Sequence, residues 1–177
     1  MATPREDLKV KIQYKNNKFM KQLKRIKKDD LLYLAGFIDA DGSIIAQIVR
    51  NKEYILKFQI RVTVQVTQLK KRRFFLEDIK EMIGVGTVRD RNEISDYVLT
   101  DTKLVCEFLK QIVPYLRLKK KQANLVVKII EQLPTARQTK ESFIQLCSLV
   151  DQVSNLNDSK SKKITADVVA KELLREE

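Results

Sequence analysis

Two aspartates one residue apart, followed at once by a glycine, end an apolar run in LLYLAGFIDADGSI, residues 31–44. If that run is a helix, Asp39 and Asp41 lie at its C-terminal end, where the helix dipole disfavours carboxylates. A divalent cation would relieve both this penalty and the repulsion between the two carboxylates. Taken alone, the Asp-Gly pair is also typical of a plain helix-to-strand turn that has Gly42 as its C-cap.

The elements that position these aspartates follow from hydrophobic spacing. A helix begins after Asp29 or Asp30, either of which can serve as its N-cap, and the longest strand has an apolar residue at every second position. The predicted strands cover 43–50, 57–68, 86–91 and 94–100, and the predicted helices cover 31–40, 72–84, 103–112, 119–133, 140–156 and 165–174. This order predicts an α+β fold in which an antiparallel sheet is followed by C-terminal helices.

The composition favours a nucleic-acid partner. The 177 residues include 35 Lys and Arg against 23 Asp and Glu, which gives a net charge of +12 and a pI near 9.7. A charge this far from neutral suits a polyanion and exceeds what solubility requires. The length is that of one domain with a substantial core.

The chain contains no histidine. This excludes Ser-His and Cys-His nucleophilic triads and histidine-dependent zinc hydrolases. Cys106 and Cys147 lie far apart in apolar helical patterns, which is typical of small core residues rather than of a disulfide framework or a zinc site. Any catalysis must therefore use carboxylates, amides, cationic side chains and a bound metal ion.

Residues 1–28 contain ten Lys or Arg against only Glu6 and Asp7, and we interpret them as a basic extension before a domain at 29–177. No apolar run is long enough to span a bilayer, and no hydrophobic segment follows the basic residues. We therefore expect a soluble intracellular protein without a membrane partner.

One face of the predicted sheet is polar and basic. On 57–68 the apolar side chains alternate with Lys, Gln, Arg and Thr, and no carboxylate interrupts them. Gln can pair bidentately with adenine and Arg with guanine in the major groove. For any single residue an ordinary solvated face explains the pattern equally well. For the whole set, together with the charge of +12, the pattern favours contact with nucleic acid.

The string LLYLAGFIDADGSI closely resembles the signature of the LAGLIDADG homing endonucleases. The resemblance continues in QVTQ, IGVGTVRDR, SDYVL, LKKKQANLV and IIEQLP, covers about residues 31–163, and is greatest to single-motif enzymes encoded in group I introns of algal chloroplasts. It implies an αββαββα core whose antiparallel sheet forms a DNA-binding saddle. It also implies intron homing by metal-dependent hydrolysis of a long pseudo-palindromic DNA site. Residues 1–28 have no counterpart in the family core.

The resemblance implies roles for individual residues. Asp41 matches the aspartate that binds metal at the scissile phosphate, and the backbone carbonyl of Ala40 is a second ligand. Gln68, Arg72 and Lys119 match the outer shell that orients water and screens phosphate charge, so they join Asp41 as predicted catalytic residues. The expected cofactor is Mg²⁺, with Mn²⁺ able to substitute and Ca²⁺ able to support binding without cleavage. No small-molecule substrate is expected.

The signature occurs once, so a two-fold-related site requires two chains and implies a homodimer. Gly36 and Ala40 are four residues apart and would let a second helix backbone approach closely. The predicted dimer interface consists of Leu34, Ala35, Gly36, Ile38, Asp39 and Ala40. Asp39 matches the family aspartate with a mainly structural role at the helix end.

The predicted DNA contacts come from the open sheet face, the turn after residue 50 and the basic SKSKK segment. They are Ser43, Ile45, Gln47, Val49, Asn51, Glu53, Tyr54, Gln59, Arg61, Thr63, Gln65, Thr87, Arg89, Arg91, Asp96, Val98, Ser159, Lys160, Ser161, Lys162 and Lys163. Phosphate contacts by the SKSKK segment would add affinity but carry little sequence information.

Two alternatives stay open on the same scaffold. One is an intron maturase, an RNA-binding splicing factor, against which the presence of Asp41, Gln68 and Lys119 argues. The other is a DNA-binding regulator that does not cleave. The resemblance also implies an organelle as the location, the chloroplast or the mitochondrion.

Overall fold

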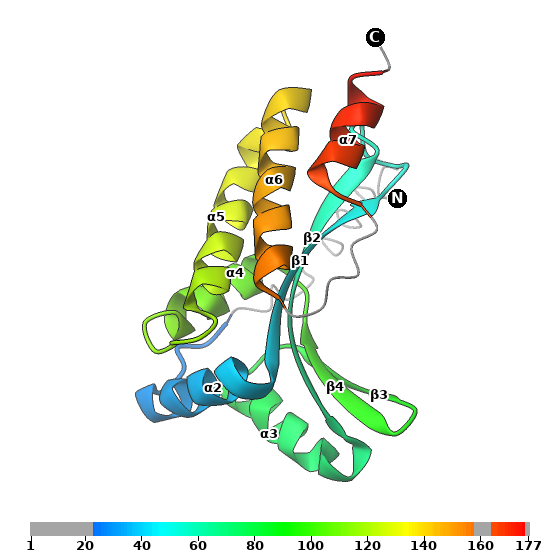
Figure 1. Cartoon of the computed structure of the whole chain (residues 1–177). Coiled ribbons are helices and arrows are strands. Elements are labelled where there is room, and N and C mark those ends of the chain that lie inside the picture. Colours follow the sequence, from blue (N-terminus) through cyan, green and yellow to red (C-terminus); the bar gives the residue numbers. More distant parts are fainter. Residues whose placement is uncertain (1–22, 158–163, 176–177) are drawn as a thin grey trace, which may run out of the picture.

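The structure is a computed structural model and describes residues 23–157 and 164–175 (Figure 1). The helices are α2 (Lys28–Asp41), α3 (Arg73–Ile83), α4 (Thr102–Ile112), α5 (Lys120–Ala136), α6 (Lys140–Leu156) and α7 (Ala166–Leu173), and the strands are β1 (Gly42–Arg50), β2 (Phe58–Leu69), β3 (Thr87–Arg91) and β4 (Ile94–Leu99). This order confirms the predicted α+β class and the αββαββα core, which ends at α4 and is followed by three further helices.

The four strands form one antiparallel sheet in the order β1-β2-β4-β3. Gly42 lies opposite Val66 and Arg50 lies opposite Phe58, so the end of α2 is beside the end of β2. Along β2 the apolar side chains are buried at every second position, at Phe58, Ile60, Val62, Val64 and Val66. The alternation seen in the sequence therefore assigned the two faces of this strand correctly.

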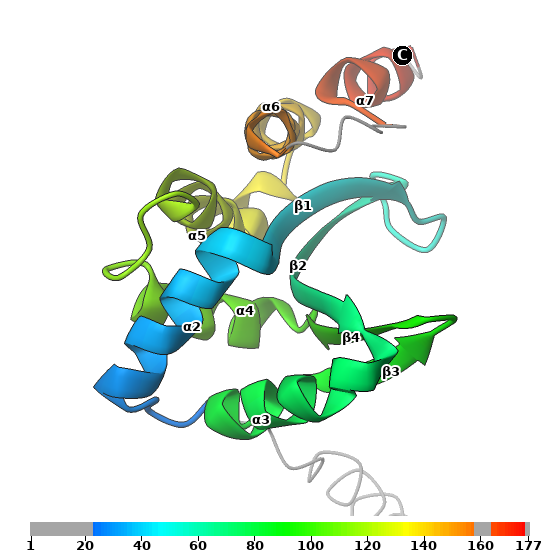
Figure 2. The ribbon, with the colours of Figure 1, turned by 60° about the horizontal axis from the view of Figure 1, so that its bottom comes forward.

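In the part of the chain that the structure describes, helices cover one face of the sheet and leave the other face open (Figure 2). Helix α4 packs on β2, α5 and α6 pack on β1, and α3 packs on β4. Large side chains from both layers, among them Phe58, Tyr97, Phe108 and Phe143, are fully buried between them. Burial of this apolar surface on one side leaves the polar faces of the strands available to a partner.

Two helix ends differ from the sequence prediction. Helix α2 begins at Lys28 after Lys27, which makes no side-chain cap, and Asp29 and Asp30 lie in its first turn, where the helix dipole favours them. Helix α5 continues through Pro134 to Ala136. A proline in the last turn removes only one backbone hydrogen bond, so the helix does not end there.

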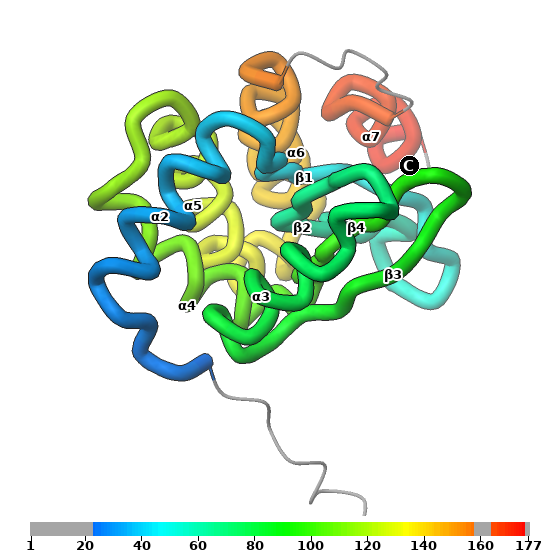
Figure 3. The backbone as a smooth tube through the Cα atoms, turned by 90° about the horizontal axis from the view of Figure 1, so that it is seen from below, coloured from blue at the N-terminus to red at the C-terminus, as the bar shows by residue number. Residues whose placement is uncertain are grey.

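Helix α2 leads directly into β1 (Figure 3). A Cβ atom at Gly42 would lie 2.7 Å from the Cα of Ile38, so only glycine fits where the strand leaves the helix. The glycine of the Asp-Gly pair therefore serves the turn, and the aspartate before it stays free to have another role.

Gly86 is confined both by its backbone and by its surroundings. Its φ is +96°, and a Cβ there would lie 2.5 Å from the ring of the fully buried Tyr97. We expect Gly86→Ala to lower the free energy of unfolding by about 3 kcal/mol or more, because backbone strain adds to overpacking.

Gly84→Ala is the matched control. Gly84 also has a positive φ of +80°, but its nearest neighbour lies 3.9 Å away, so a loss of only about 1–2 kcal/mol is expected in chemical denaturation. Equal losses would contradict the packing argument.

Helix α7 is tied to the far end of β1. Arg50 makes a bidentate pair with Glu172, and its guanidinium lies 5.3 Å from the centre of the Phe58 ring. Asp151 of α6 accepts a hydrogen bond at 2.9 Å from the backbone N–H of Ala166, at the start of α7. No helix among residues 23–157 and 164–175 is both long and apolar enough to cross a membrane.

Candidate functional site

The carboxylate of Asp41 lies exposed at the end of α2 and is linked to side chains from the end of β2. Gln68 Nε2 donates to Asp41 Oδ2 at 3.2 Å, and Arg72 Nη1 donates to Gln68 Oε1 at 3.3 Å. The pairing of Gly42 with Val66 brings these residues together, because Gln68 lies two residues beyond Val66. A chain of hydrogen bonds thus runs from a guanidinium through an amide to a carboxylate.

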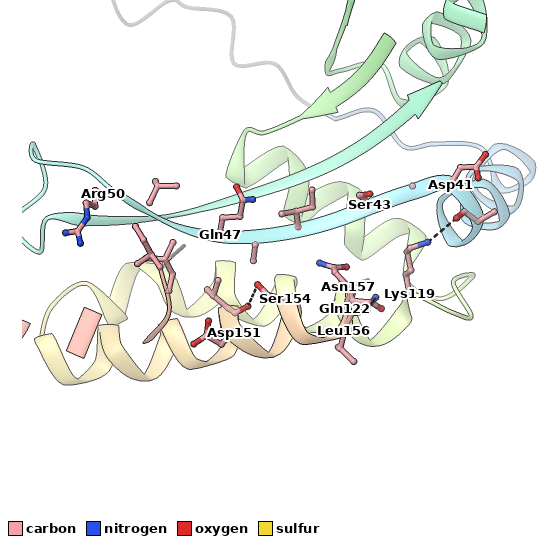
Figure 4. A pocket seen from close by; sticks show the side chains of 18 residues that line it. Asp41, Ser43, Gln47, Arg50, Lys119, Gln122, Asp151, Ser154, Leu156 and Asn157 are labelled. Atoms are coloured by element: carbon pink, nitrogen blue, oxygen red, sulfur yellow. Dashed lines mark hydrogen bonds between the residues drawn. The ribbon is translucent and has the colours of Figure 1, made fainter. Parts of the chain in front are cut away.

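Lys119 reaches the same helix end from the start of α5 (Figure 4). Its Nζ donates to the backbone carbonyl of Asp39 at 2.5 Å and lies 3.5 Å from the carbonyl oxygen of Ala40. A cation fits there because the last carbonyls of a helix carry the negative end of its dipole. The structure therefore gathers all four predicted catalytic residues, Asp41, Gln68, Arg72 and Lys119, around the end of α2.

Asp39 fastens this helix end to the loop before α5. Its carboxylate accepts hydrogen bonds from the backbone N–H groups of Arg117, Leu118 and Lys119 at 2.6, 3.1 and 2.8 Å. Burial alone would raise the pKa of Asp39, but these three hydrogen bonds and the Lys119 charge outweigh it and lower the pKa below 3.8. The two aspartates of the motif therefore have different surroundings. The Asp39 carboxylate binds the backbone of residues 117–119 and holds Lys119 in place, whereas the Asp41 carboxylate is exposed.

The lowered pKa of Asp39 predicts a pH-dependent effect on stability. A carboxylate whose pKa falls on folding stabilises the protein above its unfolded pKa, and the contribution disappears as the pH falls through the folded pKa. We therefore expect Asp39→Asn to be less stable than the wild type at neutral pH, and the difference to shrink below pH 3.8. Urea denaturation from pH 7 to pH 2 measures it. A difference that stays constant over this range would contradict the role of the Asp39 charge.

The atoms at the end of α2 fit a hard divalent cation, because the carboxylate of Asp41 and the carbonyl of Ala40 are both oxygen donors. No group of three or more carboxylates, thiols or imidazoles that could hold an ion occurs in the described part of the chain. One chain therefore supplies only part of a coordination shell. Water, a substrate oxygen or a second chain must supply the rest.

A groove of about 860 Å³ begins at Asp41 and Lys119 and follows β1 as far as Arg50 (Figure 4). Four of the predicted contact residues line it: Ser43, Ile45, Gln47 and Val49. The opposite wall comes from α5 and α6, where Asn157, just after α6, donates to the carbonyl of Ile44 at 3.3 Å. This wall carries Gln122, Asp151, Ser154 and Asn157, which could not be predicted from the sequence because only the fold brings α5 and α6 to β1.

The open face of the sheet carries exposed cations at Arg61, Arg89 and Arg91, as predicted. Two predicted contacts on this face are contradicted, because Asp96 and Val98 are only 1% and 6% exposed. Strand alternation correctly placed both residues on the open face, but it does not predict how deeply a side chain is buried.

The other predicted DNA contacts have varied surroundings. Glu53 is exposed in the turn between β1 and β2, and Thr63 and Asn51 are half-buried. Tyr54 is partly buried, and the guanidinium of Arg137, the residue after α5, lies 5.2 Å from the centre of its ring. The predicted contacts of the SKSKK segment, Ser159 to Lys163, lie outside the described residues.

The exposed side of α2 corrects the predicted dimer interface. Leu34, Ala35 and Ile38 are at most 1% exposed and belong to the chain's own core, so they offer no surface to a second chain. Gly36 and Ala40 are exposed, and Asp39 is partly exposed. Leu32 and Tyr33, which are 50% and 51% exposed, lie on the same side of the helix as Gly36 at helical spacing and were not among the predicted interface residues.

The chain is similar to known DNA endonucleases. The family model of the LAGLIDADG endonucleases matches residues 34–150. The chain is 54% identical over 142 residues to the DNA endonuclease I-CreI of Chlamydomonas reinhardtii, a match that covers 80% of this chain and 87% of the relative. It is 41% identical over 138 residues to the DNA endonuclease I-CvuI of Chlorella vulgaris, covering 77% and 85%.

Solved structures share the fold. I-CvuI in complex with the I-CreI target, in the presence of 2 mM Mg and with the DNA not cleaved, matches with a TM-score of 0.80 and 38% identity, over 84% of this chain and 97% of that one. The archaeal intron-encoded homing endonuclease I-Vdi141I, complexed with DNA, matches in fold with a TM-score of 0.75 and 21% identity, over 84% and 98%. Because the family model spans most of the chain and the sequence relatives are this similar, the chain belongs to the LAGLIDADG endonuclease family.

Proposed function

We propose that this chain is a sequence-specific homing endonuclease that hydrolyses both strands of a long pseudo-palindromic DNA site. The observation that carries the proposal is the cluster of Asp41, Gln68, Arg72 and Lys119 beside a long polar strand face. The 12 residues of β2 span roughly 40 Å at about 3.3 Å per residue, the length of about twelve base pairs. Two copies of the chain would therefore cover a site of roughly twenty base pairs or slightly more.

We assign the carboxylate of Asp41 and the carbonyl of Ala40 as protein ligands of a divalent metal ion, Mg²⁺ in the first place. When bound, such an ion would activate a water molecule and neutralise charge on the scissile phosphate. Solved complexes of I-CvuI in the presence of Mg and of Ca support the use of a divalent ion by this fold. Mn²⁺ should substitute, whereas Ca²⁺ should support binding without cleavage.

The remaining members of the cluster act on the phosphate and on water. Gln68 is held on one side by Asp41 and on the other by Arg72, so its amide is fixed beside the point where water must be oriented. Arg72 and Lys119 place positive charge where negative charge develops on the phosphate oxygens. Asp39 keeps Lys119 in place through backbone hydrogen bonds.

Two copies of the chain are needed for two cuts, and we propose that they meet through the exposed side of α2. A Cβ atom added at Gly36 would meet nothing within 4 Å, which leaves room for a second backbone. Leu32 and Tyr33 supply apolar surface beside it. The dimer would carry twice the charge of +12 of one chain, which suits long DNA.

The relatives in two algae and the resemblance to intron-encoded enzymes support an organellar location, in the first place the chloroplast. A non-cleaving regulator and a maturase are the competing functions. A supercoiled plasmid that carries a selected target distinguishes them: with Mg²⁺ the endonuclease linearises it. Binding without any cut would favour a regulator, and splicing of a group I intron RNA without DNA cleavage would favour a maturase.

Lys119→Met separates a chemical role from a binding role. Methionine keeps the length of the side chain but removes its charge from the carbonyls of Asp39 and Ala40. We expect single-turnover cleavage to slow by about 10²-fold to 10³-fold, with DNA affinity in Ca²⁺ changed by less than about tenfold. Lys128→Met, at an exposed position of α5, is the matched control and should cleave at the wild-type rate. A loss of affinity with an unchanged cleavage rate would make Lys119 a phosphate anchor instead.

A further inference from the structure

Two glutamines on the open face of β2 are held by their neighbours in opposite orientations. Gln59 and Gln65 point to the same side of the strand, which pairs with β1 on one edge and with β4 on the other. A free glutamine amide can donate and accept at once and so pair bidentately with adenine. Contacts within the protein occupy the donor group of one amide and the acceptor group of the other, so each can offer DNA only the remaining group.

Gln65 is held by the buried Asp96. Its Nε2 donates to Asp96 Oδ1 at 2.9 Å and to Thr67 Oγ1 at 3.1 Å, so both amide hydrogens are engaged within the protein. The orientation is compelled by chemistry, because an ionised carboxylate only accepts hydrogen bonds and must face the amide nitrogen. The oxygen Oε1 is the atom left for a partner, and Gln65 is therefore an acceptor.

Gln59 is held the other way round. Its Oε1 accepts from Arg61 Nε at 3.4 Å and from Asn51 Nδ2 at 3.3 Å. A guanidinium only donates, so it must face the amide oxygen. The Nε2 group of Gln59 is left for a partner, and this glutamine is a donor.

The carboxylate of Asp96 is enclosed by its neighbours on this face. It is 1% exposed, Thr67 donates to the same Oδ1 at 2.6 Å, and Arg91 Nε lies 3.4 Å from its Oδ2. That oxygen has no hydrogen bond among the described residues, so the ion pair with Arg91 is what balances it. The charge that orients Gln65 is thus covered and does not confront DNA directly.

We propose that Asp96 is a positioning residue that determines specificity by fixing Gln65 as a hydrogen-bond acceptor, while Arg61 fixes Gln59 as a donor. Gln65 then selects a base with an exocyclic amine in the major groove, N4 of cytosine or N6 of adenine. Gln59 selects a base that offers an acceptor there, such as O6 and N7 of guanine or O4 of thymine. This inference rests on the proposed function, since it assumes that the open face reads DNA.

The test is a base-preference profile, obtained by sequencing the sites that wild type, Asp96→Asn and Gln65→Lys cleave in one randomised DNA library. For the wild type we expect cytosine or adenine at the pair that Gln65 reads. In Asp96→Asn the amide side chain can both donate and accept, so Gln65 can turn over, and discrimination at that pair should relax about tenfold. Gln65→Lys keeps a donor against Asp96 but offers only donors to DNA, so the preference at that pair should change to guanine.

Asp90→Asn is the matched control, because it makes the same change on the neighbouring strand β3, where Asp90 accepts hydrogen bonds from Ser95 and Arg73 and has none with Gln65 among the described residues. Its profile should remain that of the wild type at the Gln65 pair. If Asp96→Asn lost base discrimination equally at all positions of the site, Asp96 would be a merely structural residue, and the proposal would be overturned. The proposal would also be overturned if the wild type preferred guanine or thymine at the base pair whose preference Gln65→Lys changes. If Asp96→Asn does not fold, the base-preference profiles of wild type and Gln65→Lys decide whether Gln65 acts as an acceptor. A wild type that cleaves no site would refute the proposed function rather than this inference.

Discussion

Asp41→Asn should abolish DNA cleavage while leaving folding and specific DNA binding largely intact. Asparagine keeps the volume of the side chain and can still accept the hydrogen bond from Gln68, but it removes the charged oxygen ligand at the end of α2. Metal-assisted stabilisation of the phosphate contributes several kcal/mol, so we expect a loss of at least about 10³-fold in the single-turnover rate. Cleavage and gel-shift assays on the same preparation measure the two properties.

Asp78→Asn is the matched control for this loss, since Asp78 is an exposed carboxylate on α3 and is not one of the four residues of the cluster. It should cleave at the wild-type rate. Undiminished cleavage by Asp41→Asn would refute the assignment of the metal site. Loss of binding and cleavage together would instead show that Asp41 is needed for the interface with DNA rather than for the reaction.

Gly36→Leu should separate the two chains without unfolding either of them. A Cβ at Gly36 meets nothing within 4 Å in its own chain, so leucine can be accommodated in the monomer, whereas the partner helix would lose its close approach. If both cuts require the proposed dimer, double-strand cleavage should fall to background. Sedimentation velocity measures the assembly, and circular dichroism measures the fold of the same sample.

Lys128→Leu places the same side chain on an exposed site of α5 and should stay dimeric and active. Gly42→Leu gives the opposite contrast, because its Cβ would lie 2.7 Å from Ile38 in the same chain, and it should fail to fold. A stable, fully active Gly36→Leu dimer would place the interface elsewhere on the molecule.

The sequence predicted the elements well where the hydrophobic period was strong. The alternation along β2 identified its two faces, and the helix predicted at 72–84 matches α3, which ends at Ile83 with Gly84 as its C-cap at a φ of +80°. The helix predicted at 119–133 ends just before Pro134, whereas α5 continues to Ala136, because a proline near the end of a helix costs little.

The family resemblance named Asp41, Gln68, Arg72 and Lys119 as candidate site residues but did not give their contacts. The pairing of β1 with β2 brings the first three together, and hydrogen bonds to Asp39 hold Lys119 beside them. Alternation gives the face of a residue but not its depth, so the burial of Asp96 could not be foreseen. Nor could the side of α2 that remains exposed, because both faces of this helix are apolar and only tertiary packing decides which one enters the core.

Selection of cleaved sites from a randomised duplex DNA library, in the presence of Mg²⁺, tests the central claim most directly. We expect one family of sites of roughly twenty base pairs, pseudo-palindromic and cut on both strands near the centre with short 3′ overhangs. The same selection with Asp41→Asn should return no cleaved site, and its products should match those of a reaction without protein. Cleavage without sequence enrichment, or enriched sites that Asp41→Asn cuts equally well, would contradict a sequence-specific endonuclease whose reaction depends on the end of α2.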